Sequence, residues 1–148
     1  MDKDLIVLNL KAESRSDVIS QLGNLMKKKG YVKETYKDAV LKREEKYPTG
    51  LPSEGIYVAI PHTDGSHVNN SAIAVATLKT PVVFKMMGNP ENEVNVEIVI
   101  MLAIKNPDDQ IQLLKKLMSV FQNRELLLKL KTSRNREEVV DLLRFLDE

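Results

Sequence analysis

The run of residues from Val94 to Ile104 limits the possible folds of this chain more than any other segment. Its residues first alternate between apolar and polar and then become continuously apolar. This pattern is typical of a central strand that is buried within a sheet. Shorter apolar segments predict further strands at residues 5–10, 56–60, 72–78 and 81–85. The segment 88–92 is rich in turn-forming residues and is expected to form a loop.

Segments with helical periodicity accompany these strands. Ser14 or Ser16 can cap a first helix, whose end is expected at Gly30. Further helices are predicted at residues 34–46, from Pro107, at 124–131, and after Asn135, where Asn135–Glu138 resembles a capping box. In the helix that Pro107 opens, the residues expected to face the core are Ile111, Leu114, Leu117, Met118 and Phe121. The sequence predicts an α/β fold with a mixed (parallel and antiparallel) central sheet of about five strands flanked by helices, in a single domain over residues 1–148.

Charge and composition exclude several classes of function. The formal net charge is +1, which gives no general case for binding nucleic acid or an anionic membrane. The chain has no cysteine, so a disulfide framework and a thiol nucleophile are both excluded. No apolar run reaches the ~18 residues of a membrane helix, and the first residues lack the pattern of a signal peptide. A cytoplasmic protein without a membrane-inserted segment is expected.

One segment, from Gly55 to Asp64, points to chemistry. Its apolar residues fit a buried strand, and Pro61 is expected to end that strand because it cannot donate a ladder hydrogen bond. His62 would then lie at the carboxyl end of a core strand, where open α/β sheets place their ligands. The chain has one other histidine, His67, in a turn that is expected to be exposed. A histidine after a strand is often structural, but a neutral imidazole is also a good nucleophile near pH 7.

Side chains that could assist such an imidazole precede and follow it. Arg43 falls on the apolar stripe of the helix at 34–46, whereas Glu44 is expected to point elsewhere. An arginine on that stripe either reaches a partner, such as a phosphate, or extends its stem to the helix edge. The hydroxyls of Thr49 or Thr63 could hold a phosphoryl oxygen or orient the ring. Asp64 could also orient the imidazole, although an aspartate at this position commonly serves the turn.

Motifs for other chemistries are absent from the sequence. It contains no Walker loop, no glycine-rich dinucleotide turn, no zinc-ligand spacing and no calcium loop. Neither a metal nor another cofactor is therefore expected.

The residues around His62 resemble a known family. The matching segments are Ala39–Glu45, Thr49-Gly50 and Val58-Ala59-Ile60-Pro61-His62. They resemble enzyme IIA of the phosphoenolpyruvate-dependent sugar phosphotransferase system, fructose/mannitol superfamily, over nearly the whole chain. The stretch Tyr47–Pro52 looks most like the galactitol-type branch. Many relatives carry a second histidine where Gln110 stands here, so that role does not carry over.

The resemblance implies a phosphoryl carrier. His62 would accept a phosphoryl group from the histidine-containing phosphocarrier protein, with Arg43 stabilising the group in transfer. His62 would pass it to a cysteine of a separate enzyme IIB, which serves a membrane enzyme IIC for galactitol or a related sugar or polyol. Both partners are expected to dock on one surface around His62, with Leu51, Met86 and Met87 as candidate contacts. Two alternatives remain open: a regulatory interaction module switched by phosphorylation of His62, and a small-ligand binding domain.

Overall fold

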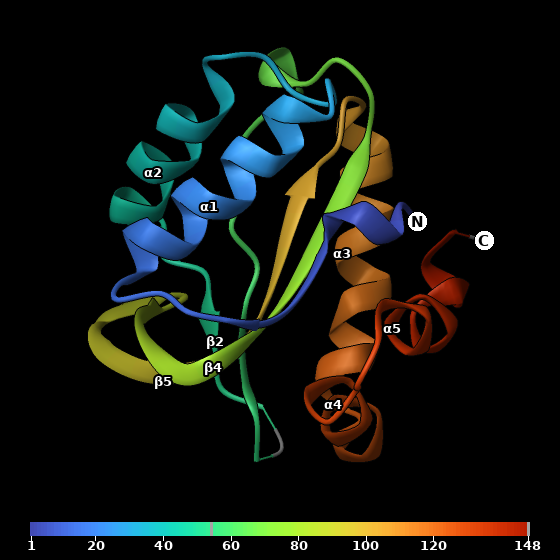
Figure 1. Ribbon diagram of the computed structural model, residues 1–148. Helices are drawn as coiled ribbons and strands as arrows, with labels where there is room; N and C mark the ends of the chain where they lie inside the picture. Colours follow the sequence, from blue (N-terminus) through green and yellow to red (C-terminus); the bar gives the residue numbers. More distant parts are fainter. Residues whose placement is uncertain (54, 148) are drawn as a thin grey trace.

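The computed structural model describes residues 1–53 and 55–147 (Figure 1). Within them, one mixed sheet of five strands lies between two layers of helices, as predicted. The strands are β1 (Ile6–Leu10), β2 (Gly50–Leu51), β3 (Tyr57–Ala59), β4 (Ala72–Met86) and β5 (Asn89–Ala103). Helices α1 (Arg15–Lys28) and α2 (Tyr36–Lys46) cover one face, and α3 (Pro107–Phe121), α4 (Arg124–Lys131) and α5 (Arg136–Leu142) cover the other. Short 3₁₀ turns lie at Lys3–Leu5, Gly65–His67 and Arg144–Asp147.

The strand pairing combines both directions. β1 runs parallel to β4, β4 runs antiparallel to β5, and β5 runs parallel to β3. β2 pairs antiparallel with β3, and its Gly50 also pairs with Met86 near the end of β4. The short strand β2 therefore joins β3 to the end of the long β4–β5 hairpin, and this contact brings the 47–51 segment to the sheet.

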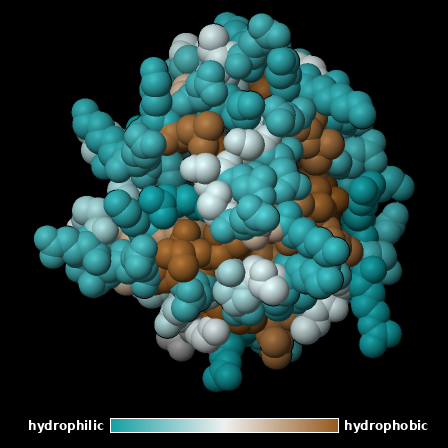
Figure 2. All heavy atoms as spheres, turned by 60° about the vertical axis from the view of Figure 1, so that its left-hand side comes forward, coloured by the Kyte–Doolittle hydropathy of each residue, from teal (hydrophilic) through white to brown (hydrophobic). Residues whose placement is uncertain are grey.

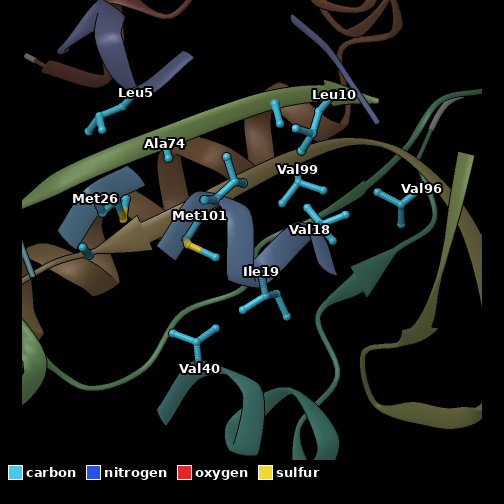
Figure 3. Packing of buried hydrophobic residues seen from close by; sticks show 14 of the residues in the cluster. Leu5, Leu10, Val18, Ile19, Met26, Val40, Ala74, Val96, Val99 and Met101 are labelled. Atoms are coloured by element: carbon cyan, nitrogen blue, oxygen red, sulfur yellow. The ribbon is translucent and has the colours of Figure 1, made fainter. Parts of the chain in front are cut away.

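The central strand is buried on both faces, which explains its continuous apolar run. Val99 and Met101 pack against α1 and α2 in one hydrophobic cluster (Figure 3). Ile98, Ile100 and Leu102 point to the opposite face, where they pack with residues of α3, α4 and α5. Successive side chains of β5 thus pack alternately into the two hydrophobic clusters, one on each face of the sheet.

The β4–β5 hairpin differs from the sequence prediction. Residues 72–78 and 81–85 belong to a single strand, β4, with a register shift between Thr77 and Val82. Pro81 lies within that irregular stretch, where a residue that cannot donate a ladder bond is tolerated. The predicted loop at 88–92 is wrong, because β5 already begins at Asn89. Gly88 has a φ of +75°, so a turn of two residues suffices to reverse the chain.

The helices begin and end close to their predicted positions. The Ser14 hydroxyl accepts the Asp17 N–H at the start of α1, and Gly30, with a φ of +84°, follows its end. In α3, however, Ile111 and Met118 are exposed, so the prediction that they face the core is wrong. The buried face of α3 consists of Leu113, Leu117, Val120 and Phe121.

Candidate functional site

His62 follows the end of β3 after Ile60 and Pro61, and it lies beside Leu102 near the end of β5. The Ile60 N–H donates to the Thr49 carbonyl at 3.3 Å, and the Leu102 N–H donates to the Pro61 carbonyl at 3.0 Å. His62 itself forms an isolated parallel bridge with Leu102. The backbone is therefore held from both sides, and His62 stands at the carboxyl end of a core strand, as the sequence predicts.

The imidazole of His62 is buried, with 7% of the residue exposed, and one of its nitrogens is already engaged. Nδ1 lies 2.7 Å from the Ile60 carbonyl oxygen. Because a carbonyl can only accept, Nδ1 must carry the proton, which leaves an unprotonated Nε2 in the neutral ring. Burial lowers the pKa of His62, and the positive charge of Arg43 lowers it further against the opposing effect of the Ile60 bond. The arrangement favours a neutral imidazole with Nε2 as its nucleophilic atom.

Arg43 occupies a different face of α2 from the one predicted. The buried stripe of this helix consists of Tyr36, Val40 and Glu44, while Arg43 is exposed. The Arg43 guanidinium lies 5.2 Å from the centre of the Tyr47 ring. Among the described residues it forms no ion pair, and its charge acts on His62. Arg43 thus supplies a cation near the imidazole, and its guanidinium N–H groups can donate to an anion.

The prediction that Glu44 points away from the buried stripe is wrong. Its carboxylate is buried and accepts two bonds from Thr49, the N–H at 2.7 Å and the hydroxyl at 2.7 Å. Burial raises the pKa of Glu44 to about 7. Its position four residues after Val40 was the signal for a buried side chain. Thr49 was predicted to hold a phosphoryl oxygen with its hydroxyl. In the structure that hydroxyl already donates its hydrogen to Glu44.

Thr63 and Asp64 follow His62 in different settings. Thr63 is buried, whereas the Asp64 carboxylate accepts from both the N–H and the hydroxyl of Ser66, and these bonds lower its pKa. Asp64 also lies 3.9 Å from Nε2 of His67, whose Nδ1 lies 2.7 Å from the Thr35 hydroxyl. His67 is half-buried, with 26% of its side chain exposed, and not exposed as predicted. The group that orients His62 is the Ile60 carbonyl, which sequence reasoning missed.

The structure brings Arg43, Glu44, Thr49 and His62 together in one region. Gln110 is half-buried in the first turn of α3, and its side-chain oxygen has no hydrogen-bond partner among residues 1–53 and 55–147. Those residues contain no group of three or more acidic or histidine side chains that could hold a metal ion. No helix among them is long and apolar enough to cross a membrane.

Comparisons with known proteins agree with this arrangement. The family model described as "Phosphoenolpyruvate-dependent sugar phosphotransferase system, EIIA 2" matches residues 1–145. The galactitol-specific EIIA component of Escherichia coli is 37% identical over 108 residues, which cover 73% of this chain and 71% of that protein. The transcriptional regulator ManR of Bacillus subtilis is 38% identical over 104 residues, which cover 70% of this chain and 14% of the regulator.

A solved structure with the same fold is that of mannitol enzyme IIA from Escherichia coli in complex with phosphorylated mannitol enzyme IIB. It matches with a TM-score of 0.80 at 24% identity, over 98% of this chain and 97% of that one. At this identity the match establishes the common fold.

Proposed function

Because the chain belongs to the EIIA 2 family of the phosphoenolpyruvate-dependent sugar phosphotransferase system, we propose that His62 is its phosphorylated residue. The observation that carries the proposal is the bond from Nδ1 of His62 to the Ile60 carbonyl. It directs the free electron pair of the neutral ring to Nε2, and the lowered pKa keeps the ring neutral near pH 7. The family consists of phosphoryl carriers, and a neutral imidazole held in one tautomer suits that role.

The proposed reaction is a pair of in-line displacements. The Nε2 electron pair attacks the phosphorus of the histidine-containing phosphocarrier protein, and the donor's phosphorus–nitrogen bond breaks with its electron pair returning to the donor ring. A thiolate of enzyme IIB then attacks the same phosphorus, and the bond to Nε2 breaks in turn. Throughout, the proton stays on Nδ1 and is donated to the Ile60 carbonyl oxygen. This hydrogen bond stabilises the positive charge that the ring acquires on phosphorylation.

Arg43 is proposed to stabilise the phosphoryl group. Transfer needs positive charge around three equatorial oxygens, and the guanidinium offers both charge and directed N–H donors. Its contact with Tyr47 places it on the solvent side of α2, where it can meet an incoming group. Neither a metal nor another cofactor is needed for this step, because the protein supplies the cation.

The partners are proposed by analogy with the relatives. A separate enzyme IIB, serving a membrane enzyme IIC for galactitol or a related polyol, fits the similarity to the galactitol-specific component. On the site side of the molecule Tyr47 and Met87 are exposed, while Leu51 and Met86 are half-buried. The Met87 N–H donates to the Gly50 carbonyl at 2.8 Å, which places the hairpin turn beside the segment that holds Thr49.

A weak, shared docking surface for both partners is therefore proposed around Tyr47 and Met87. Figure 2 shows the side of α1 and α2, where hydrophobic patches are set among hydrophilic side chains, a pattern suited to transient contacts. We place the carrier in the cytoplasm as a single domain over residues 1–148.

The test is phosphorylation by the upstream proteins. Incubation with phosphoenolpyruvate, enzyme I and the phosphocarrier protein is expected to give one acid-labile, base-stable adduct on His62. The variant His62→Ala should lose the label, and His67→Ala, the matched control, should keep it. A label that maps to His67, or that survives in His62→Ala, would reject the assignment.

A regulatory module switched by phosphorylation of His62 is the second candidate, favoured by the similarity to part of the regulator ManR. The two functions differ in the fate of the phosphoryl group. A carrier transfers the label to a galactitol-type enzyme IIB within the assay, whereas a regulatory module retains it and changes its affinity for another protein.

A further inference from the structure

A continuous series of hydrogen bonds connects α2 to the imidazole of His62. The Glu44 carboxylate accepts the N–H and hydroxyl of Thr49, each at 2.7 Å. The Thr49 carbonyl accepts the Ile60 N–H at 3.3 Å, and the Ile60 carbonyl accepts from Nδ1 of His62 at 2.7 Å. The side chains of Glu44 and Thr49 are almost fully buried, so water cannot easily replace these bonds.

We propose that Glu44 is a positioning residue for phosphoryl transfer, which acts through Thr49 and Ile60 to hold His62 in a single orientation and tautomer. The inference rests on the proposed phosphorylation of His62. Among the described residues, the hydrogen bonds of the Glu44 carboxylate go to Thr49 and not to the imidazole, so the proposed role is positioning and not catalysis.

The position of Glu44 in the chain lets it fix both halves of the site. It directly follows Arg43 in the last turn of α2, where the Tyr47 N–H donates to the Arg43 carbonyl at 2.6 Å. Its carboxylate then holds Thr49, the residue just before the short strand β2. Thr49 in turn binds the N–H of Ile60, the residue just after β3 whose carbonyl accepts from His62. One buried side chain thus connects the helix turn that carries Arg43 to the segment that orients His62.

The other charged groups that act on Glu44 are cations. Arg15, at the start of α1, and Arg43 both favour its ionised form, and no acidic side chain is among the groups that shift it. Both Thr49 bonds also survive protonation of Glu44, because the Thr49 hydroxyl can turn from donor to acceptor while the N–H keeps a carboxyl oxygen. Glutamine can make the same pair of bonds with its carbonyl and amide groups, so Glu44→Gln is the conservative variant.

The first experiment observes the ring before any phosphorylation. Nitrogen chemical shifts of the His62 imidazole distinguish a proton on Nδ1 from a proton on Nε2. Wild type, Glu44→Gln, Thr49→Ser and the matched control Glu45→Gln should all show the Nδ1-protonated form. Thr49→Val, which leaves a carboxylate oxygen without its donor, and Glu44→Ala should show a mixture of the two tautomers.

The second experiment measures phosphoryl transfer from the phosphocarrier protein. Loss of orientation should lower kcat at least about tenfold in Thr49→Val and Glu44→Ala while KM stays near the wild-type value. Glu44→Gln, Thr49→Ser and Glu45→Gln should remain within about threefold of wild type. If Glu44→Ala fails to fold, the Thr49→Val and Thr49→Ser pair still decides, because it removes and restores one hydroxyl.

Two results would overturn the inference: a wild-type tautomer and kcat in Thr49→Val, or a loss confined to KM, which would place the effect on docking. Failure of the proposed function would look different. It would appear as labelling that does not depend on His62, and the tautomer measurement would still report on Glu44 because it uses the unphosphorylated protein.

Discussion

Ionisation of Glu44 should lower the stability of the fold as the pH rises. The carboxyl is 4% exposed, and burial raises its pKa from 4.5 to about 7. Below pH 4.5 the group is protonated in both the folded and the unfolded chain and contributes no pH dependence. Between these values the unfolded chain releases the proton while the folded chain keeps it, so ionisation favours unfolding.

The size of the effect follows from that interval. Each pH unit across it lowers the free energy of unfolding by about 1.4 kcal/mol, so the full cost above pH 7 is about 3 kcal/mol. Glu44→Gln remains neutral at every pH and keeps both Thr49 bonds. The free energy of unfolding of Glu44→Gln minus that of wild type should therefore rise by about 3 kcal/mol between pH 4.5 and about pH 8.

Urea denaturation at a series of pH values measures this difference directly. Comparing the two proteins cancels the other titrating groups, and Glu45→Gln, at an exposed neighbouring glutamate, should show a nearly constant difference from wild type. A difference for Glu44→Gln that stays constant, or that falls as the pH rises, would refute the reasoning. It would mean that the two Thr49 bonds and the nearby arginines outweigh the desolvation of the carboxylate.

The remaining predictions concern Arg43 and the contacts of β2. Arg43→Gln should raise the pKa of His62, measured by NMR titration, but not to its ordinary value, because burial is the larger cause of the lowering; an unchanged pKa would show that the guanidinium does not act on the ring. Arg43→Lys should slow transfer in rapid-quench assays by an amount corresponding to at most about 2–4 kcal/mol while leaving the fold intact, and a wild-type rate would assign Arg43 to packing against Tyr47. Gly50→Ala should lower the free energy of unfolding by about 1–3 kcal/mol in urea denaturation, because its Cβ would lie 2.6 Å from the Lys85 carbonyl oxygen and 2.7 Å from a Val94 methyl. The helical control Gly23→Ala meets only the flexible Lys37 side chain and its backbone at 3.3 Å or more, so equal losses in the two variants would contradict the steric argument.

Local signals in the sequence were sufficient for most helices and for the placement of His62. Ser14 and Asn135 accept N–H groups at the starts of α1 and α5, as their positions predicted. Pro107 opens α3 and is followed by helical residues to Phe121. These signals act within one turn of the chain, so no tertiary information was needed to read them.

Features that depend on contacts between distant segments were not predictable in the same way. Two predictions were wrong for this reason. Residues 72–85 do not form two strands, because pairing with β5 continues β4 through its irregular stretch. Residues 89–92 do not form a loop, because the same pairing extends to Asn89, opposite Met86. In α2 the error was one residue, since Arg43 and Glu44 differ by about 100° around the helix. Burial of a glutamate is costly unless its carboxylate is hydrogen-bonded. The bonds come from the N–H and hydroxyl of Thr49, and the sequence does not show that Thr49 folds back onto Glu44.

The site divides into a rigid part and an accessible part, and this division bears on how one imidazole could serve two partners. Tyr36 donates to the Leu102 carbonyl at 2.6 Å near one end of α2, and Glu44 accepts from Thr49 near the other end. The helix is therefore tied at both ends to residues that bond to the segment around His62. Arg43, Tyr47 and Met87 remain exposed beside this buried frame. A donor and an acceptor that bind in turn can repack against the exposed side chains, while the buried bonds keep Nε2 in the same place for both. On this reasoning, changes at Tyr47 or Met87 should alter KM for the two partners, whereas changes at Thr49 should alter kcat for both to a similar extent.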